Sequence, residues 1–260
     1  MSRVATKLST NHPRIAIITG ATSGIGEATA RRLIAAGCGV VGNGRNPDKL
    51  RDLERQLGAA FCGIAGDASD SAILDQLFAA AIEHFGKPAD IVVANAGRGL
   101  GGSVNDADLS RFEDVLRLNV TGTLALLQRA ANSMIATQPN RYPEQAADIV
   151  IIGSVVGRHV SPFSAVYGAT KFAVHGLAEG LRREVGPKGI RVTLVEPGVV
   201  VSGFQDAAGY DSKMVQTFND KFGPLLHGED IANAIHFVVT QPPHVHVSDI
   251  MIRPTRQDYP

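Results

Sequence analysis

Short apolar runs alternate with longer amphipathic stretches along almost the whole chain, and this alternation limits the folds that the chain can adopt. The runs predicted as strands are Arg14–Thr19, Gly39–Asn43, Ala59–Ile64, Ile91–Ala94, Asp148–Ile152, Arg191–Val195 and Val245–Ile252. Helical spacing predicts helices over Glu27–Ala36, Pro47–Leu57, Ser69–Phe85, Asp108–Ile135, Ser164–Val185 and Glu229–Val239. The strands are apolar throughout, as a parallel sheet buried on both faces requires. We therefore predict an α/β fold: a doubly wound, Rossmann-type parallel sheet of seven strands with helices on both faces.

No internal repeat or low-complexity linker divides the sequence, so residues 1–260 are predicted to form a single domain, with residues 1–13 as an N-terminal extension. Two segments interrupt the strand–helix pattern. Thr137–Ala147 is polar and contains proline, and Gly198–Leu226 is a long connection between a strand and a helix. Long connections often cover binding sites, so Gly198–Leu226 is predicted to be a substrate lid.

Composition excludes several classes of protein. The formal net charge is zero and no Lys or Arg run is present, which argues against a nucleic-acid partner. No apolar run approaches the ~20 residues that span a bilayer, and the N-terminus has no leader-like apolar region. The two cysteines, Cys38 and Cys62, lack the spacing of a metal site. We expect a cytoplasmic protein without a metal or a membrane partner.

A glycine-rich segment follows the first predicted strand directly and leads into the first predicted helix. It reads TGATSGIG over Thr19–Gly26. Glycines allow a tight turn and bring backbone N–H groups close to phosphate, while the helix N-terminus adds a partial positive charge. Such glycines can also form a plain turn, but their place between strand and helix favours nucleotide binding. The residues assigned to this loop are Gly20, Thr22, Ser23, Gly24, Ile25 and Gly26.

The residues after the second strand are expected to meet the adenosine ribose. The stretch 42–46 contains no carboxylate for the 2′-hydroxyl of NAD(H), whereas Arg45 suits the 2′-phosphate of NADP(H) and Asn43 can add a hydrogen bond. We predict NADP(H), with NAD(H) as the alternative if Arg45 only faces solvent. Asp67, after the third strand, is assigned to adenine. The residues expected to line the cofactor after the fourth strand are Asn95, Ala96 and Gly97.

Tyr167 and Lys171 lie four residues apart in a predicted helix and so share one face. A free tyrosine has a pKa near ~10, and a nearby ammonium stabilises its phenolate. The lysine can also bind the ribose of the nicotinamide. This spacing is common by chance, but Ser154 at the end of the fifth strand adds a hydroxyl that can hold a substrate oxygen. Ser154 can instead be a simple helix or turn cap. Asn119 lies in the middle of a predicted helix, where asparagine is disfavoured, and it can take part in a proton relay or fill a gap in the core.

Taken in order, these motifs resemble the short-chain dehydrogenase/reductase family over nearly the whole chain. They are TGATSGIG, Asp67, NAG at Asn95–Gly97, Asn119, Ser154, YGATK at Tyr167–Lys171 and EPG at Glu196–Gly198. The resemblance implies a catalytic tetrad of Asn119, Ser154, Tyr167 and Lys171 that supports hydride transfer between nicotinamide and an alcohol or carbonyl. It implies further cofactor contacts at Tyr167, Lys171, Pro197, Gly198, Val200 and Ser202. The stretch DIMIRPTRQ is similar to NADP-dependent members that oxidise 3-hydroxy acids or serine-like substrates.

Four positions depart from the family pattern, and none removes a tetrad member. Ala94 replaces the first asparagine of the usual NNAG, Gly153 stands where a second serine is common, and Ser202 replaces a threonine. Arg98 follows NAG where small or apolar residues are usual, and it can hold a substrate carboxylate or face solvent. The residues assigned to a small-molecule substrate are Arg98, Ser154, His159 and Tyr167, while Phe163 is a further contact or a packing residue.

Two other functions remain open on the same fold: an epimerase or dehydratase, and a non-catalytic NADP(H) sensor or scaffold. A sensor is expected to have lost part of the tetrad, which is complete here. The predicted helix Asp108–Ile135 has six apolar residues assigned to one face: Leu109, Phe112, Leu116, Val120, Leu124 and Leu127. This helix and the predicted helix Ser164–Val185 have apolar residues on more than one face, which suggests burial against another subunit. Members of the family that the chain resembles usually form dimers or tetramers. We therefore expect a homodimer or homotetramer.

Overall fold

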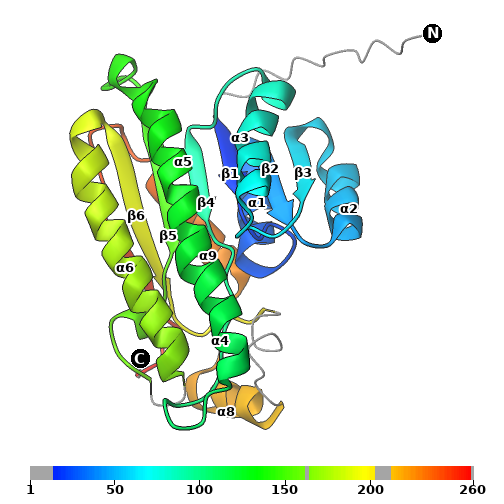
Figure 1. Cartoon of the computed structure of the whole chain (residues 1–260), viewed down its shortest axis with the longest axis vertical. Coiled ribbons are helices and arrows are strands. Elements are labelled where there is room, and N and C mark those ends of the chain that lie inside the picture. Colours follow the sequence, from blue (N-terminus) through cyan, green and yellow to red (C-terminus); the bar gives the residue numbers. More distant parts are fainter. Residues whose placement is uncertain (1–13, 162–163, 203–211, 259–260) are drawn as a thin grey trace.

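The computed structural model contains one seven-stranded sheet in which every neighbouring pair is parallel, and it describes residues 14–161, 164–202 and 212–258. The sheet order is β3-β2-β1-β4-β5-β6-β7 (Figure 1). The strands are β1 (Ile15–Ile18), β2 (Gly39–Gly44), β3 (Phe61–Ala65), β4 (Ile91–Ala94), β5 (Ala147–Ile152), β6 (Ile190–Pro197) and β7 (Asp249–Ile252). The helices are α1 (Gly24–Ala35), α2 (Pro47–Leu57), α3 (Ser71–Phe85), α4 (Leu109–Leu116), α5 (Thr123–Ile135), α6 (Ala165–Val185), α8 (Ser212–Phe222) and α9 (Gly228–Val239). The predicted doubly wound fold is confirmed.

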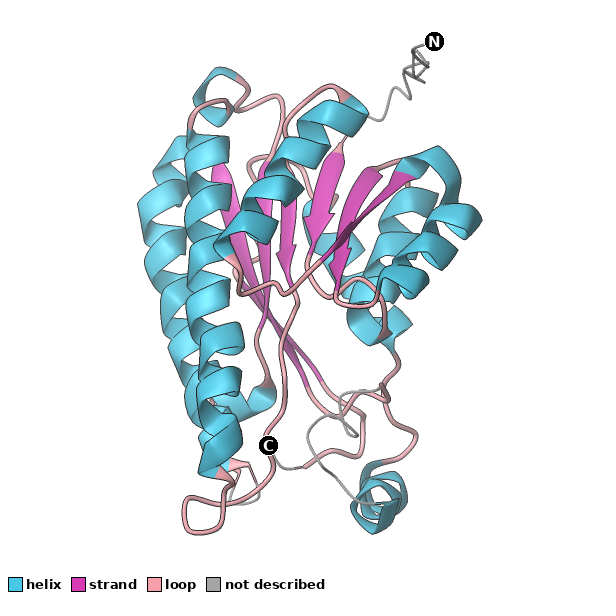
Figure 2. Cartoon of the chain, turned by 45° about the vertical axis from the view of Figure 1, so that its right-hand side comes forward, coloured by secondary structure: helices cyan, strands magenta, loops and turns pink. Residues whose placement is uncertain are grey.

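Each face of the sheet has its own hydrophobic core, and helices cover both faces (Figure 2). Alternate residues of one strand enter different cores: Ile17 packs with Leu77 of α3 and Leu126 of α5, whereas Ile18 packs with Leu33 of α1 and Ile235 of α9. Because both faces are covered, the central strands have no polar side to show in their sequence. This is why those strands could be predicted within one or two residues.

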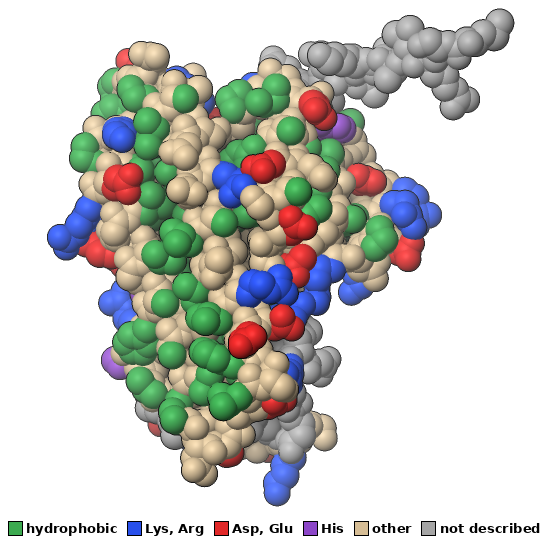
Figure 3. Space-filling view, in the orientation of Figure 1, with side chains coloured by type: hydrophobic (Ala, Val, Ile, Leu, Met, Phe, Trp, Pro, Cys, Tyr) green, Lys and Arg blue, Asp and Glu red, His purple; other side chains and the backbone are tan. Residues whose placement is uncertain are grey.

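The predicted continuous helix Asp108–Ile135 is wrong. The chain forms α4, then a π-helical segment over Arg117–Gly122, then α5. The extra residue of a π turn changes the direction in which later side chains point. Leu109, Leu116 and Leu124 are exposed, whereas Leu127 is buried, so the six apolar residues do not share one face. Figure 3 shows hydrophobic side chains gathered on the outer surface over α4, α5 and α6.

The predicted lid also contains structure that the sequence reading left out. Residues 212–222 form α8, which lies apart from the two helix layers and beyond the carboxyl ends of the strands (Figure 1). Residues 203–211 of the predicted lid, residues 1–13 of the predicted N-terminal extension and Phe163 lie outside the described residues. The boundaries predicted for a single domain therefore stay a prediction.

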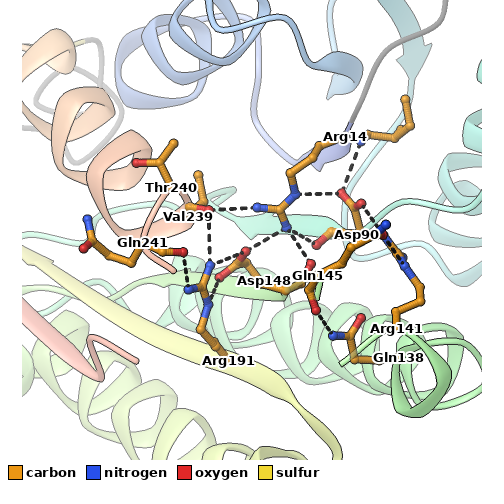
Figure 4. Close-up of polar contacts among 12 residues, drawn as sticks. Arg14, Asp90, Gln138, Arg141, Gln145, Asp148, Arg191, Val239, Thr240 and Gln241 are labelled. Carbon is orange, nitrogen blue, oxygen red and sulfur yellow. Dashed lines mark hydrogen bonds and ion pairs between the residues drawn. The ribbon is translucent and has the colours of Figure 1, made fainter. Parts of the chain in front are cut away.

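A buried ion network joins the amino ends of the central strands (Figure 4). Arg14, before β1, contacts Asp90 at 3.2 Å and Asp148 of β5 at 2.7 Å. Arg191 of β6 contacts Asp148 at 2.7 Å, and Arg141 contacts Asp90 at 3.1 Å. Both aspartate side chains are almost fully buried. A buried charge is tolerated only when paired, so this network ties the ends of β1, β4, β5 and β6 to one arrangement.

The network gives a role to the segment Thr137–Ala147, for which the sequence indicated none. Arg141 lies in that segment, and Gln138 donates from Nε2 to the carbonyl of Gln145 at 2.6 Å. Arg14 also donates to the carbonyl of Val239 at the end of α9. Helix, loop and strand ends therefore converge on the same two carboxylates.

Across residues 14–161, 164–202 and 212–258, no helix is long and apolar enough to cross a membrane. Over the same residues, histidine, cysteine and acidic side chains form no group of three that could hold a metal ion.

Replacing Asp148 by Asn is expected to destabilise the fold strongly. The change removes the charge that Arg14 and Arg191 both face, and leaving such a partner unpaired typically costs about 3–5 kcal/mol. Urea unfolding would measure the loss. The matched control is Asp75→Asn, which breaks an exposed ion pair with Arg129 and should barely move the midpoint. A loss no larger than that of the control would contradict this role for the network.

Candidate active site

A cavity of 640 Å³ opens along the carboxyl edge of the sheet, at the opposite ends of the strands from the ion network. Its walls come from residues at or after the ends of β1, β2, β3, β4, β5 and β6, and from α6 and α8. Nineteen of the twenty-two assigned site residues line this cavity. Seventeen of them are Gly20, Thr22, Ser23, Gly24, Ile25, Asn43, Arg45, Asp67, Asn95, Ala96, Gly97, Arg98, Ser154, Tyr167, Lys171, Pro197 and Gly198. Val200 and Ser202 line it as well.

Three assigned residues lie elsewhere. Gly26 and Asn119 are buried behind the cavity wall, and each supports residues that do line it, as described below. His159 is exposed and is not among the lining residues. The structure therefore does not bring His159 to the cavity, and it has no part in the function proposed below.

The glycine loop is shaped by two positive φ angles and one close approach. Gly20 and Gly24 have φ values of 68° and 53°, which residues other than glycine rarely adopt. At Gly26 a Cβ atom would lie 2.1 Å from the carbonyl oxygen of Gly20, so a side chain cannot fit. Asn95 donates from Nδ2 to the carbonyls of Thr19 and Gly20, at 2.9 and 3.2 Å. The loop is thus held against the sheet edge with the first turn of α1 at its end.

This loop fits the diphosphate of a dinucleotide. The first N–H groups of a helix have no partner within the helix, and together with the helix dipole they bind anions. Gly20, Thr22, Ser23, Gly24 and Ile25 all face the cavity where α1 begins. The glycines keep the wall free of side chains at the point where a phosphate would approach.

The end of the cavity that is predicted to hold adenosine lies at β2 and β3. Arg45 is exposed at its rim, directly after β2. Asn43 is buried and donates from Nδ2 to the carbonyls of Ile64 and Gly66, both at 3.1 Å, so that nitrogen holds the end of β3. The hydrogen bond from Asn43 to the cofactor stays a prediction.

Asp67 is held as a carboxylate at this end of the cavity. Burial alone would raise its pKa, but hydrogen bonds from Ser69 and the charges of Arg117 and Arg98 outweigh burial and lower the pKa. The N–H of Ser69 donates to Asp67 at 2.9 Å, and Arg117 Nη1 lies 3.5 Å from its other oxygen. An ionised, oriented acceptor at this position suits the amino group of adenine.

Tyr167 and Lys171 are buried on α6 beside the end of β5. Lys171 Nζ lies 5.8 Å from the centre of the Tyr167 ring and donates to the carbonyl of Ile152 at 2.7 Å. Burial lowers the pKa of Lys171 to about 8. Two residues after the end of β5 comes Ser154, whose Oγ accepts a hydrogen bond from the N–H of Val156 and caps a short 3₁₀ turn. Phenol, ammonium and hydroxyl therefore share one part of the wall.

Asn119 holds this wall together from the π-helical segment. Its Oδ1 accepts from the N–H of Arg98, and its Nδ2 donates to the Arg98 carbonyl, both at 2.9 Å. Nδ2 also donates to Thr170 Oγ1, which in turn donates to the carbonyl of Tyr167. The segment after β4 and the first turns of α6 are therefore coupled through one buried amide. The relay role predicted for Asn119 stays a prediction.

Sequence reasoning missed several lining residues. Phe218, Lys221 and Phe222 of α8 close one side, and Gln257 accepts from the N–H of Val199 at 2.9 Å. At Gly198 a Cβ atom would lie 2.2 Å from Gln257 Oε1, so another residue there would displace the Gln257 side chain. The spacing of Val215, Phe218 and Phe222 was a usable signal for α8. Gln257 gave none, because its contact joins residues far apart in the chain.

The sheet, its helix layers and the glycine loop at its carboxyl edge define a Rossmann-type α/β protein. The family model described as short chain dehydrogenase matches residues 14–212. An uncharacterised oxidoreductase of Staphylococcus epidermidis is 32% identical over 241 residues, which cover 93% of this chain and 97% of that protein. The chain belongs to the short-chain dehydrogenase family and is an oxidoreductase, as the motifs predicted.

Two solved structures are similar over nearly the full length. The closed form of serine dehydrogenase complexed with NADP⁺ has a TM-score of 0.85 at 29% identity, covering 94% of this chain and 96% of the other. A 3-ketoacyl-(acyl-carrier-protein) reductase from Brucella melitensis complexed with NADH has a TM-score of 0.84 at 26% identity, with coverage of 94% and 98%.

The lowered pKa of Lys171 predicts a pH-dependent contribution to stability. In the native state the pKa is about 8, against 10.5 for an unperturbed lysine, so between these values the unfolded chain binds more protons. Stability must therefore rise with pH across that window, by up to about 3 kcal/mol. Below about pH 8 both states are protonated and this contribution is lost.

The measurement compares the urea unfolding of the wild type and Lys171→Met from about pH 7 to about pH 10. The wild type should gain stability relative to Lys171→Met as pH rises, because only the wild type has the buried amine. Parallel profiles for the two proteins would show that Lys171 is not buried as an amine with a lowered pKa.

Proposed function

We propose that this protein is an NADP(H)-dependent oxidoreductase that acts on a CH–OH group or the corresponding carbonyl. The observation that carries the proposal is the buried pair Tyr167 and Lys171, which lines the same cavity as Ser154 and the glycine loop. A bound nicotinamide would supply the hydride for carbonyl reduction and accept it in alcohol oxidation. The chain itself must then bind the cofactor, hold the substrate oxygen and move one proton.

The proton is assigned to Tyr167. In the reducing direction its phenol gives a proton to the oxygen that gains negative charge as hydride reaches the carbonyl carbon, and in the oxidising direction the phenolate takes that proton back. The ammonium of Lys171 favours the phenolate form. The hydrogen bond to the same oxygen is assigned to the hydroxyl of Ser154, which lines the cavity with Tyr167, and Asn119 holds the surrounding backbone. No metal is needed for this proton balance.

Arg45 supports NADP(H) over NAD(H), whereas Asp67 and Ser202 would contact parts that the two cofactors share. Arg45 stands at the rim of the adenosine end with no carboxylate in residues 42–46, which suits a 2′-phosphate. Asp67 is an ionised acceptor for adenine, and Ser202 is a candidate partner for the nicotinamide amide. The similar serine dehydrogenase was solved with NADP⁺, while the similar reductase was solved with NADH, so the choice rests mainly on Arg45.

The substrate is proposed to be a small hydroxy acid or its keto form. Arg98 lines the cavity and is half-buried. Its ion pair with the exposed Asp114 is long, at 4.0 Å, and therefore weak, which leaves the guanidinium available for a carboxylate. Lys221 of α8 adds a further cation to the lining. A steady-state screen of serine, 3-hydroxy acids and simple ketones with both cofactors would test this assignment first.

We also propose that copies of the chain associate as a dimer or tetramer. Leu109 of α4, Leu116 of α4, Leu124 of α5 and Phe172 of α6 are exposed, and Figure 3 shows the apolar surface over these helices. Large apolar patches of this kind are typical of interfaces. The cytoplasmic location expected from the sequence stays a prediction.

Replacing Tyr167 by Phe is expected to lower turnover by at least ~100-fold, because it removes the proton donor and little else. Binding of NADPH, followed by fluorescence titration, should be nearly unchanged. The matched control is Tyr142→Phe, which removes an exposed hydroxyl far from the cavity. Wild-type turnover in Tyr167→Phe would end the assignment, and cofactor binding without turnover of any substrate by the wild type would favour a sensor.

Replacing Arg45 by Asp is expected to reverse the cofactor preference. The carboxylate repels a 2′-phosphate but can accept a bond from a 2′-hydroxyl. The ratio of kcat/KM for NADPH to that for NADH should fall by at least ~10-fold, as the loss of one charged hydrogen bond implies. Arg55→Asp, an exposed change on α2, serves as the control. An unchanged ratio would remove Arg45 from the cofactor site.

A further inference from the structure

His175 occupies the space directly behind Ser154. It lies on α6 four residues after Lys171, so Tyr167, Lys171 and His175 form one stripe along the helix. A Cβ atom at Gly153 or at Gly157 would lie 2.4 Å from His175 Nε2. The imidazole therefore fills the room on both sides of Ser154, and it explains why Gly153 stands where the family pattern has a second serine.

Two side chains of this stripe on α6 hydrogen-bond to the backbone on either side of Gly153. Lys171 Nζ donates to the carbonyl of Ile152 at 2.7 Å, and the N–H of Ser154 donates to His175 Nε2 at 3.3 Å. Ser154 is then the N-cap residue of the 3₁₀ turn, and the N–H of Gly157 donates back to its carbonyl at 2.9 Å. Through these bonds the main chain of Ser154 is held at both its N–H and its carbonyl, while its side chain lines the cavity.

Charged groups lie on the other side of the ring, with the buried Glu196 nearest to it. His175 Nδ1 lies 3.8 Å from a carboxylate oxygen of Glu196, which is fully buried in β6. Arg158 donates to Glu196 at 2.7 Å and to Asp249 of β7 at 3.1 Å. The imidazole therefore has a carboxylate oxygen 3.8 Å from Nδ1 and a backbone donor at Nε2, and both favour this orientation of the ring.

The ring is neutral at ordinary pH. Burial lowers the pKa of His175 to about 4, and the nearby charges of Lys171 and Arg158 lower it further than Asp249 raises it. Since Nε2 accepts the bond from Ser154, the single proton belongs on Nδ1, facing Glu196. A neutral acceptor in this place does not compete with the ammonium of Lys171.

We propose that His175 is a positioning residue for Ser154: its ring replaces a side chain at residue 153 and fixes the Ser154 backbone, so that the hydroxyl points at the substrate oxygen. The inference rests on the proposed function, because it concerns the step in which Ser154 holds that oxygen. It assigns to the chain a functional histidine outside the tetrad, which acts through the serine and touches neither substrate nor cofactor.

The first test is a double-mutant cycle on the full-length enzyme. His175→Ala should lower kcat by roughly 10- to 100-fold, as a small misplacement of a reacting group does, with KM changed less than kcat. The Kd for NADPH should stay unchanged. In the Ser154→Ala background, His175→Ala should have almost no further effect, because the hydroxyl that it positions is gone. Equal effects in both backgrounds would overturn the proposal.

The second test uses residue 153. Gly153→Ser in the wild type forces a side chain into the imidazole and should reduce kcat and the melting temperature. In His175→Ala the same change enters the vacated space and removes a flexible glycine, so it should have no cost or should recover part of the activity. If Gly153→Ser is equally harmful in both backgrounds, the ring does not stand in for a side chain at 153.

A readout independent of turnover guards against variants that only fold poorly. Hydrogen exchange of the peptide covering residues 150–158 should become faster in His175→Ala, while the peptide covering β1 and the glycine loop should be unchanged. His175→Asn, which keeps an acceptor on a smaller side chain, should fall between wild type and His175→Ala in both exchange and kcat. His84→Ala, on the exposed face of α3, is the control.

The outcomes separate this proposal from the proposed function. If the wild type reduces a carbonyl and Tyr167→Phe does not, the proposed function stands, and His175 is then judged on the two cycles alone. If Tyr167→Phe keeps wild-type turnover, the proposed function fails whatever His175 does. Uniform loss of exchange protection over the whole chain in both His175 variants would show a general structural role and overturn the positioning role.

Discussion

The carboxylates of Asp90 and Asp148 can be buried at the amino edge of the sheet because three arginines surround them. Hydrophobic packing strongly favours the burial of each strand but constrains only weakly the register of one strand relative to the next. Charges are less tolerant, because a shift that separates a buried pair leaves both partners unsolvated. The network therefore sets the relative position of β1, β4, β5 and β6, and each loop at the far edge starts from a strand placed in this way.

The amino edge of the sheet stabilises the fold, whereas the carboxyl edge forms the cavity. At the amino edge, strong buried interactions hold the framework, and at the carboxyl edge the chain accepts features that cost stability. These include a buried lysine, glycines in left-handed conformations and an open cavity. Rigid strands between the two edges keep the groups at the cavity in place without requiring each of them to be stable by itself. This arrangement suits a family in which loops vary on one scaffold.

The sequence predicted the features that depend on local geometry. Continuous apolar runs predicted the strands, the four-residue spacing of Tyr167 and Lys171 placed both on one helix face, and the glycines fitted a tight loop. Features that depend on contacts between distant residues were missed or wrong. His159 was assigned to the substrate but is exposed, and Gln257 was overlooked although it closes the wall beside Gly198. His175 gave no signal alone; the pair Gly153 and Gly157 would have been the clue, once read as room left for a ring.

The π-helical segment between α4 and α5 sets the rotation of α5 about its axis relative to α4. Each residue of an α-helix turns the next by about 100°, so one residue more or fewer in residues 117–122 would rotate all of α5 by that angle relative to α4. Leu127, now in the core, would leave it, and the buried amide of Asn119 would lose either Arg98 or Thr170. The length of this short segment is therefore fixed by two separate demands, packing on one side and the cavity wall on the other. Substitutions there can be tolerated where a single insertion or deletion cannot.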